Sequence, residues 1–349
     1  MSARAPRPSL SGRGRLAESP QSASGASSSP GTGSWIGPIL SVLLLCAACS
    51  APASGQAWTQ GVGQTYTKFS YSSVTASDRY TFDGRQVDYN ESRSSTPFRD
   101  RSLYLYTEAG ITDDVTLVLN VPIKRLSIRS PTFRYETQAL GSIRLGGRYD
   151  LDAHLGAIGA PNQLALNGTV TLPTGYTRNY RPSAGPGQVN LSLTLDYGRS
   201  LSPLPLYVQA GAGFRYRSGW YGLSRATPCQ PGTDIDCLAD QTANLGDEWL
   251  ASAEVGATPL GGGVLVQGLA KTIWSVQRPQ TSFLASNPVP KRRRSVKIGG
   301  GLTVYPSRLL GTSVLSPLGI GVQAYWTPVG RNTIRSRDLF VGVEYSASL

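Results

Sequence analysis

The sequence has little charge and almost no histidine. Charged residues make up 15% of its 349 residues, and His154 is the single histidine, whereas a soluble domain carries about 25% charged residues. Hydrolytic enzymes commonly need a histidine as general base, and His154 stands in a predicted turn beside Asp150 and Asp152. The sequence has no zinc-ligand spacing and no phosphate-binding loop. We therefore predict no catalytic, cofactor-binding or metal site, and we expect the chain not to be an enzyme.

Acidic residues are the scarcer charged class, which leaves a formal net charge of +12. Such a balance suits nucleic acid or an anionic membrane surface. No helix-turn-helix or RNA-recognition signature accompanies it, so nucleic acid is not an expected partner. In contrast, 40 glycines, 17 tyrosines and 6 tryptophans suit a protein with one face toward lipid and another toward water.

Cysteine is also scarce, and its four positions fall into two pairs. Cys46 and Cys49 lie in an apolar N-terminal run, while Cys229 and Cys237 lie in a loop rich in Gly, Pro and Asp. The second pair is consistent with one disulfide that closes a loop in an oxidising compartment.

The first 57 residues have the order of a secretory signal peptide. Residues 1–34 are rich in Ser, Gly, Pro and Ala with scattered Arg, and an apolar run over 35–48 follows. That run is shorter than the about 20 residues that span a bilayer, and small residues come next. We predict cleavage after Ala57, which would leave Trp58 at the mature N-terminus; Ala53 is the alternative site. A lipoprotein with Cys49 acylated is a second alternative.

From Trp58 onward, apolar and polar residues alternate. Val115, Leu117 and Leu119, for example, alternate with Thr116 and Asn120. Successive side chains of a strand point to opposite faces, so each segment has one apolar and one polar face. The pattern predicts an all-β chain of about twelve antiparallel strands, near 62–76, 101–111, 115–125, 139–150, 163–173, 187–199, 206–217, 247–257, 263–274, 294–306, 318–327 and 338–349. In strand 263–274, Leu265 and Leu269 compete with Val264 and Val266 for the apolar face.

The lengths of strands and connections favour a transmembrane β-barrel. Several predicted strands have about 10 to 12 residues, the length that a tilted strand needs to cross a bilayer. Long loops are predicted at 77–100, 126–138, 174–186, 218–246, 275–293 and 328–337, and they alternate with mostly shorter turns, as in outer-membrane barrels. The soluble alternative is a β-sandwich or a lipocalin-like barrel, which would need a very large apolar core. We therefore predict an outer-membrane β-barrel over residues 58–349.

If the apolar face meets lipid, the polar residues face the lumen. Predicted lumen-lining residues are Glu108, Arg144, Arg148, Arg215, Arg217, Glu254, Lys297, Gly299, Gly301, Gly319 and Gly321. Lysine and arginine outnumber the acids on this face, which favours anions. The alternative is that these charges pair across the barrel and stiffen it. The glycines predict either a wall that lines an open path or positions where a sheet bends.

Short motifs give the chain a family resemblance. They are Tyr106 to Leu117, the run Leu140-Gly141-Ser142-Ile143-Arg144-Leu145-Gly146-Gly147-Arg148-Tyr149, the strand end Leu172-Pro173-Thr174-Gly175, and Gly211 to Arg217. The order of these motifs resembles the outer-membrane family named for the meta-pathway of phenol degradation. The resemblance implies an outer-membrane barrel that takes up small hydrophobic or aromatic compounds. A more distant similarity is to the long-chain fatty-acid outer-membrane transporters. Those carry an N-terminal plug, whereas here strand-like sequence starts within a few residues of Trp58.

The predicted function is therefore that of an outer-membrane channel or transporter for small solutes. The alternative is a structural or adhesive barrel that binds partners through its long outer loops, foremost 218–246 with Trp220 and Tyr221. Expected partners are outer-membrane lipid and lipopolysaccharide, whose phosphates Lys291-Arg292-Arg293-Arg294 could bind, and a small-molecule cargo. The expected location is the bacterial outer membrane.

Overall fold

The computed structural model describes residues 56–88, 96–129, 134–155, 161–178, 182–225, 246–276, 293–312 and 318–348. Cys229, Cys237, Cys46 and Cys49 lie outside these ranges, as does the predicted signal peptide up to residue 55. The predicted disulfide, acylation and cleavage sites therefore stay predictions.

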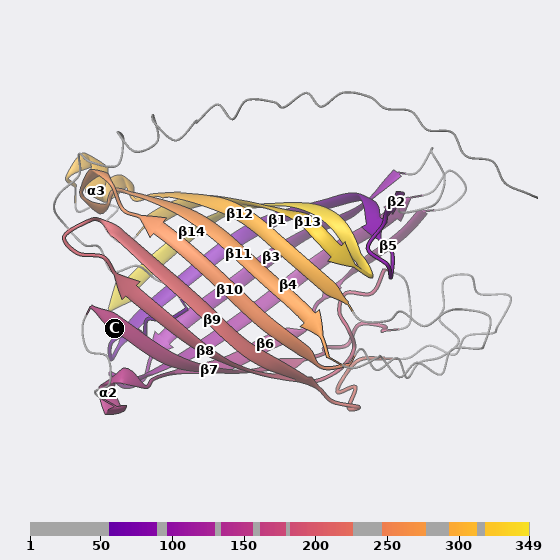
Figure 1. The fold of residues 1–349 in the computed structure, drawn as a ribbon, viewed down its shortest axis with the longest axis horizontal. Coiled ribbons are helices and arrows are strands. Elements are labelled where there is room, and N and C mark those ends of the chain that lie inside the picture. The colour runs from indigo at the N-terminus through magenta and orange to yellow at the C-terminus, as the bar shows by residue number, and fades with distance from the viewer. Residues whose placement is uncertain are drawn as a thin grey trace, which may run out of the picture. The chain divides into compact units, whose positions relative to one another are not determined.

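Twelve antiparallel strands form one closed barrel (Figure 1). In chain order they are β1 (Gln64–Tyr80), β3 (Thr96–Gly110), β4 (Val115–Arg129), β6 (Ile143–Asp150), β7 (Asn162–Leu172), β8 (Asn190–Ser200), β9 (Leu206–Arg217), β10 (Glu248–Ala257), β11 (Val264–Ser275), β12 (Arg294–Val304), β13 (Leu318–Arg331) and β14 (Thr333–Ser348). Each pairs with the next, and β14 pairs with β1 from Gln64↔Ser348 to Tyr80↔Thr333. The prediction of about twelve strands in a barrel is confirmed.

Two short strands extend this wall. β2 (Gln86–Asp88) pairs with the C-terminal end of β1. β5 (Arg134–Leu140) pairs with the C-terminal half of β4, and β6 pairs with its N-terminal half. β5 and β6 thus share one place in the wall, separated by Gly141 and Ser142. The prediction of one strand over 139–150 missed the β5 portion, since its sequence Arg134–Leu140 is polar and resembles a loop.

The predicted loop 328–337 is wrong. β13 continues to Arg331 and β14 starts at Thr333, so a single residue, Asn332, connects them with φ at 47°. Polar residues such as Arg335 and Arg337 read as loop residues, but they belong to strands that project beyond the apolar belt of the barrel, where water can surround both faces.

Apolar side chains point out of the barrel and polar side chains point in. Leu117 is 52% exposed on the outer surface, whereas its neighbour Thr116 is fully buried. The same contrast holds between Leu191 and Ser192 and along most of the other strands. The orientation predicted from the alternation is confirmed. In β11 the structure places Leu265 and Leu269 inside and Val266 outside.

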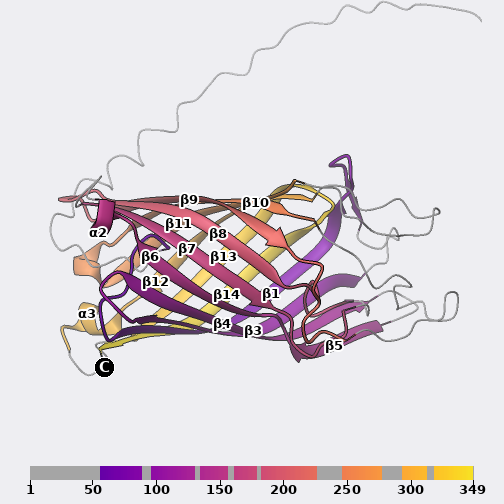
Figure 2. The same ribbon diagram turned by 90° about the horizontal axis from the view of Figure 1, so that it is seen from below.

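Most of the longer gaps between strands fall at one end of the barrel (Figures 1 and 2). This is the end at which β1, β4, β7, β9 and β11 finish, and we call it the long-loop end. The other is the short-turn end, where β1 begins and β14 ends. Short helices lie there: α2 (Asp152–Leu155), the 3-10 turn η1 (Leu260–Gly262) and α3 (Pro306–Leu310).

Helices of the described ranges are all too short or too polar to cross a membrane.

Candidate functional site: the barrel interior

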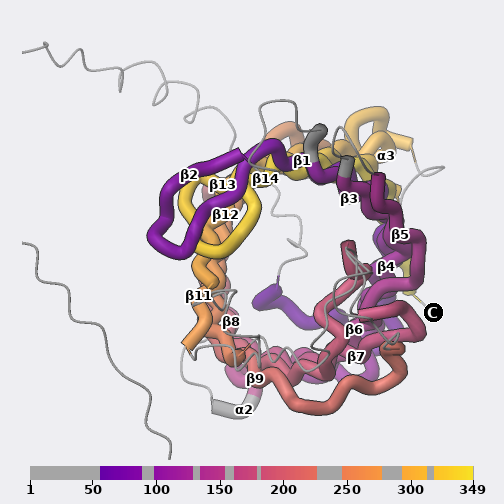
Figure 3. The backbone as a smooth tube through the Cα atoms, turned by 90° about the vertical axis from the view of Figure 1, so that its right-hand side faces the viewer, coloured from indigo at the N-terminus to yellow at the C-terminus, as the bar shows by residue number. Residues whose placement is uncertain are grey.

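The segment that precedes β1 lies inside the barrel. Figure 3 shows this indigo stretch within the ring of strands. Ala57 is fully buried, and a Cβ atom added at Gly198 of β8 would come within 2.9 Å of Ala57 and 2.8 Å of Trp58. The segment enters β1 where the Gly63 amide donates to the Gly110 carbonyl at 3.0 Å. The segment is short, because β1 begins at Gln64, a few residues after Trp58, as the sequence predicted.

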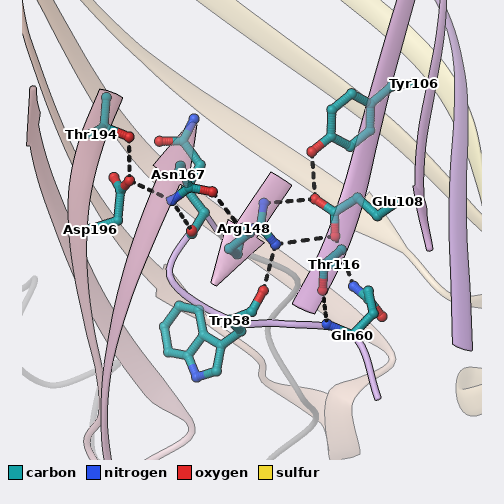
Figure 4. Close-up of polar contacts among 10 residues, drawn as sticks. Trp58, Gln60, Tyr106, Glu108, Thr116, Arg148, Asn167, Thr194 and Asp196 are labelled. Carbon is teal, nitrogen blue, oxygen red and sulfur yellow. Dashed lines mark hydrogen bonds and ion pairs between the residues drawn. The ribbon is translucent and has the colours of Figure 1, made fainter. Parts of the chain in front are cut away.

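Arg148 holds the segment from β6 (Figure 4). Its guanidinium donates to the Trp58 carbonyl at 2.5 Å and lies 2.9 Å from the Glu108 carboxylate. It also donates to the Asn167 side chain at 2.9 Å, and Asn167 in turn donates to Asp196 at 2.7 Å. Arg148 and Glu108 are both almost fully buried. Their charges compensate each other, and the remaining lone pairs are hydrogen-bonded. The interior can therefore accommodate this buried ion pair.

Further contacts fix the two sides of the segment. The Gln60 amide donates to the Thr116 hydroxyl at 2.7 Å, and its side chain donates to Glu108 at 2.9 Å. The Trp58 ring packs edge-on against Tyr207 of β9 with centroids 5.6 Å apart. Contacts thus come from both β3–β4 and β9, so the segment crosses the interior near the short-turn end and narrows it.

Two more polar groups line the same end. Tyr207 and Gln267 both donate to Glu254, at 2.5 and 2.6 Å. Glu344 of β14 accepts from Tyr66 at 2.8 Å and from Tyr305 at 2.6 Å. The carboxylates of Glu254 and Glu344 therefore both accept hydrogen bonds from neighbouring hydroxyl or amide groups.

The middle of the interior carries two cations of a different kind. Arg144 of β6 and Lys271 of β11 are exposed, although both strands direct these side chains inward. Neither forms an ion pair or hydrogen bond with another described residue; Lys271 lies 5.4 Å from the centre of the Tyr325 ring. Exposure inside a closed wall means that water-filled space reaches both groups.

Two cavities meet at this level. One, of about 460 Å³, lies toward the long-loop end and includes Lys124, Asn190 and Arg217 in its lining. The other, of about 360 Å³, extends to Gln56 and Asp196 beside the N-terminal segment. Arg144 and Arg215 line both cavities, and Lys271 lines the second. A path from the long-loop end toward the segment 56–63 therefore passes these cations.

Arginines near the long-loop end are paired. Glu248 is almost fully buried and lies 3.0 Å from Arg215, 2.8 Å from Arg217 and 3.9 Å from Arg293. Lys124 faces Asp100 at 3.7 Å. Glu248 thus lies among three guanidinium groups, which leaves its immediate surroundings positive.

The connection 173–189 folds over this end of the interior. Tyr176 packs with Leu126 and Ala184 in a small apolar cluster, and its hydroxyl contacts that of Ser142 at 2.8 Å. The Gly187 amide donates to the same hydroxyl at 2.9 Å. Burial raises the pKa of Tyr176. Ala184 also lines the larger cavity, so this connection narrows its mouth.

The inward glycines of β12 and β13 face occupied space. A Cβ atom at Gly299 would lie 2.2 Å from the Ala324 carbonyl, and one at Gly319 would lie 2.7 Å from Glu344. At Gly301 it would meet Gln267 at 3.0 Å, and at Gly321 it would meet Thr303 at 2.8 Å. Neighbouring backbone and side chains take up the room that these glycines leave, which favours close packing of the wall over a bare open path.

The predicted lumen residues thus fall into different groups. Glu108 and Arg148 form one ion pair, Arg215 and Arg217 share Glu248, and Lys297 pairs with Asp338. Glu254 is hydrogen-bonded, and Arg144 stands alone at the junction of the cavities. The sequence interpretation missed Lys271 and the segment 56–63. Lys271 was detectable in principle, because it shares the parity of Leu265 and Leu269 once those are placed inside.

Within the described ranges, no group of three His, Cys, Asp or Glu side chains could hold a metal ion. His154 falls in α2 at the short-turn end.

Comparison with known proteins establishes the fold. No protein-family model and no curated protein sequence matches the chain. Its structure is similar to the COG4313 outer membrane channel from Pseudomonas putida F1, with a TM-score of 0.64 and 15% identity over 84% of this chain and 98% of that one. The translocator domain of autotransporter NalP from Neisseria meningitidis gives a TM-score of 0.42 with 11% identity over 82% and 89%. The CymD monoaromatic hydrocarbon channel gives 0.39 with 8% over 83% and 89%.

At 15% identity the first of these similarities shows a shared barrel fold and no more, and the other two are too weak to argue from. Membership in the phenol-degradation family and the similarity to fatty-acid transporters therefore stay predictions.

Proposed function

We propose that the chain is a channel of the bacterial outer membrane that passes small organic anions. The barrel carries an apolar outer surface and a polar interior, as a lipid-embedded barrel requires. The polar interior supports a passage over an enzyme. The long-loop end would face outward and the short-turn end the periplasm, as in other barrels with an even strand number.

One observation carries the choice of anions. Arg144 stands exposed where the two cavities meet and Lys271 stands exposed in the smaller one, and neither forms an ion pair with an acid of the described residues. A passage lined by positive charge attracts anions and repels cations, and charges without a counter-charge contribute most to that field. Charges that pair along the wall, such as Arg148 on β6 and Glu108 on β3, stiffen it and contribute little to selectivity. The proposal thus assigns the two interpretations of the lumen charges to different residues.

Apolar side chains beside these cations support an organic cargo. Tyr106, Leu250 and Ile273 line the smaller cavity together with Arg144 and Lys271. A small carboxylate with an aromatic or aliphatic body could contact both kinds of group, since binding sites combine an apolar lining with a few placed charges. The resemblance to the phenol-degradation family supports an aromatic body.

Reversal potentials in planar bilayers test the proposal. With a potassium benzoate gradient, the wild-type channel should prefer benzoate over potassium, and the double variant Arg144→Gln, Lys271→Gln should lose most of that preference. Arg125→Gln is the matched control: it removes one positive charge from an outward-facing position of β4 and should leave the potential unchanged. A folded barrel that never conducts, or a double variant with wild-type selectivity, would contradict the proposal.

Partner binding through the outer loops is the second candidate. It is favoured by Trp220 and Leu223, which are 66% and 76% exposed beside the long-loop end. Replacing both with serine should abolish attachment to a host or bacterial surface while conductance persists. If attachment is unaffected, this candidate loses its support.

A further inference from the structure

Three arginines gather on the outer surface of the barrel near the long-loop end. Arg99 and Arg101 lie in β3, and Arg125 lies in β4. The register places Arg101 directly opposite Arg125 and Arg99 opposite Ser127. Asp100, which lies between Arg99 and Arg101, and Lys124, which precedes Arg125, face inward and pair with each other. We call Arg99, Arg101 and Arg125 the arginine patch.

The patch has no acidic partner in the part of the chain that the structure describes. None of its guanidinium groups forms an ion pair or hydrogen bond with another described residue. The nearby carboxylate of Glu136 accepts from Arg134 at 2.8 Å. Like charges directly opposite each other on neighbouring strands destabilise a sheet. The Arg101–Arg125 pair therefore costs stability unless an anion lies between the two groups.

The position of the patch limits what that anion can be. The next outward-facing pair toward the short-turn end is Leu103 opposite Ile123, followed by Leu105 opposite Val121. Leu103 is 36% exposed and Ile123 is 51% exposed. The patch therefore lies at the boundary where the apolar belt gives way to polar surface. A ligand here has an acidic group at that boundary and apolar chains along the strands below it.

We propose that the arginine patch binds the phosphates of lipid A, the phosphorylated glycolipid anchor of lipopolysaccharide, in the outer leaflet. Arginine presents a planar fork of donors that suits phosphate oxygens, and two facing forks can hold one phosphate from both sides. The acyl chains of the same molecule would then cover Leu103 and Ile123. The inference rests on the proposed outer-membrane location and orientation and is independent of ion conduction.

Binding of purified lipid to the refolded full-length barrel tests the inference. The probes are diphosphorylated lipid A, the same glycolipid after removal of both phosphates, and inorganic phosphate, each titrated in detergent and followed by native mass spectrometry. The wild-type barrel should retain lipid A. The double variant Arg101→Gln, Arg125→Gln should lose at least about tenfold in affinity for it. Lys124→Gln is the control, because it removes one positive charge next to Arg125 on the inner face and leaves the arginine patch intact.

Thermal stability gives a second readout that a merely structural role would not produce. Without lipid, the double variant should be at least as heat-stable as the wild type, since repulsion is relieved. With lipid A, the wild type should gain stability and the variant should not. Equal binding by the double variant, equal binding of the dephosphorylated glycolipid, or equal occupancy by inorganic phosphate at the same concentration would each overturn the inference. Heat-modifiable gel migration separates these outcomes from a chain that forms no barrel, which would overturn the proposed function itself.

Discussion

The guanidinium of Arg148 joins the carbonyl of Trp58 at 2.5 Å to the carboxylate of Glu108 at 2.9 Å. This buried side chain is one of the links between the N-terminal segment and the barrel wall. The same ion pair that stiffens β3 and β6 also holds the segment that narrows the interior. The stability of the wall and the narrowing of the interior therefore both depend on Arg148.

Loosening that segment should open the channel. Replacing residues 58–61 with Gly-Ser-Gly-Ser keeps the chain length but removes the Trp58–Tyr207 and Gln60–Glu108 contacts. Single-channel conductance should rise, because fewer contacts, among them the backbone hydrogen bonds to Arg148 and Thr116, would still hold the segment across the path. The matched control is Trp220→Ser, which removes an exposed tryptophan outside the interior. Unchanged conductance in the Gly-Ser variant would show that the segment does not limit the current.

Neutralising Glu108 should destabilise the whole barrel. Glu108→Gln leaves the buried Arg148 without its counter-charge, and breaking a buried pair in this way costs about 3–5 kcal/mol. The temperature at which the folded form disappears on a gel should fall clearly. Glu136→Gln is the control, because its pair with Arg134 is largely exposed and such pairs contribute about 0–1 kcal/mol. Equal shifts in the two variants would contradict the role assigned to Glu108.

Side chains should not be tolerated at Gly299. Gly299→Ala would place a Cβ atom 2.2 Å from the Ala324 carbonyl, and overpacking of this kind costs about 1–3 kcal/mol. Gly147→Ala has its nearest neighbour at 4.0 Å and should be nearly neutral. The unfolding midpoints of both variants in urea check the difference. A neutral Gly299→Ala would mean that β12 and β13 can separate without loss.

A bulky residue at Gly301 should reduce conductance. The Cβ of Gly301→Trp would meet Gln267 and Gln323 at 3.0 and 3.1 Å, and both are flexible side chains that can yield, so the indole would project into the interior. Single-channel recordings should show a smaller current. Gly147→Trp, on the outward face, should keep the wild-type value. A full current in Gly301→Trp would place the path along another part of the wall.

The hydroxyl of Tyr176 should steady the connection 173–189. Tyr176→Phe keeps the apolar cluster but removes the acceptor for the Gly187 amide and the contact with Ser142. Each lost hydrogen bond costs about 0.5–1.5 kcal/mol, so the connection should move more freely. Amide hydrogen exchange at residues 182–189 should quicken, while exchange within β7 stays the same. Slow exchange in the variant would assign the closure to other contacts.

The barrel could be predicted from the sequence because a strand between lipid and polar interior has a strict period of two. Leu117 and Thr116 must take opposite faces, and the same requirement recurs in every strand. Predicted and observed strands therefore agree in number and place. The errors lie at the long-loop end, around β5 and Asn332, where both faces of a strand meet water and the alternation weakens.

The interior could be predicted less well, because periodicity gives a side chain's face and not its partner. Arg144 and Arg148 lie four residues apart on the same face, yet one is unpaired and the other is buried against Glu108. That difference depends on which strands lie across the interior. The segment 56–63 has no repeating pattern at all, since its contacts come from many strands that assemble only when the barrel closes.

The pairing of β1 with β14 has a consequence for how the molecule fails. The closed wall leaves neither terminal strand with an unsatisfied edge, and in hydrocarbon a free edge would leave a row of backbone amides without partners. Shortening β14 would expose two edges at once, so a truncated chain should not settle into a smaller ring. Loss of the final strand should instead send the whole polypeptide to proteolysis, with no intermediate product of fewer strands.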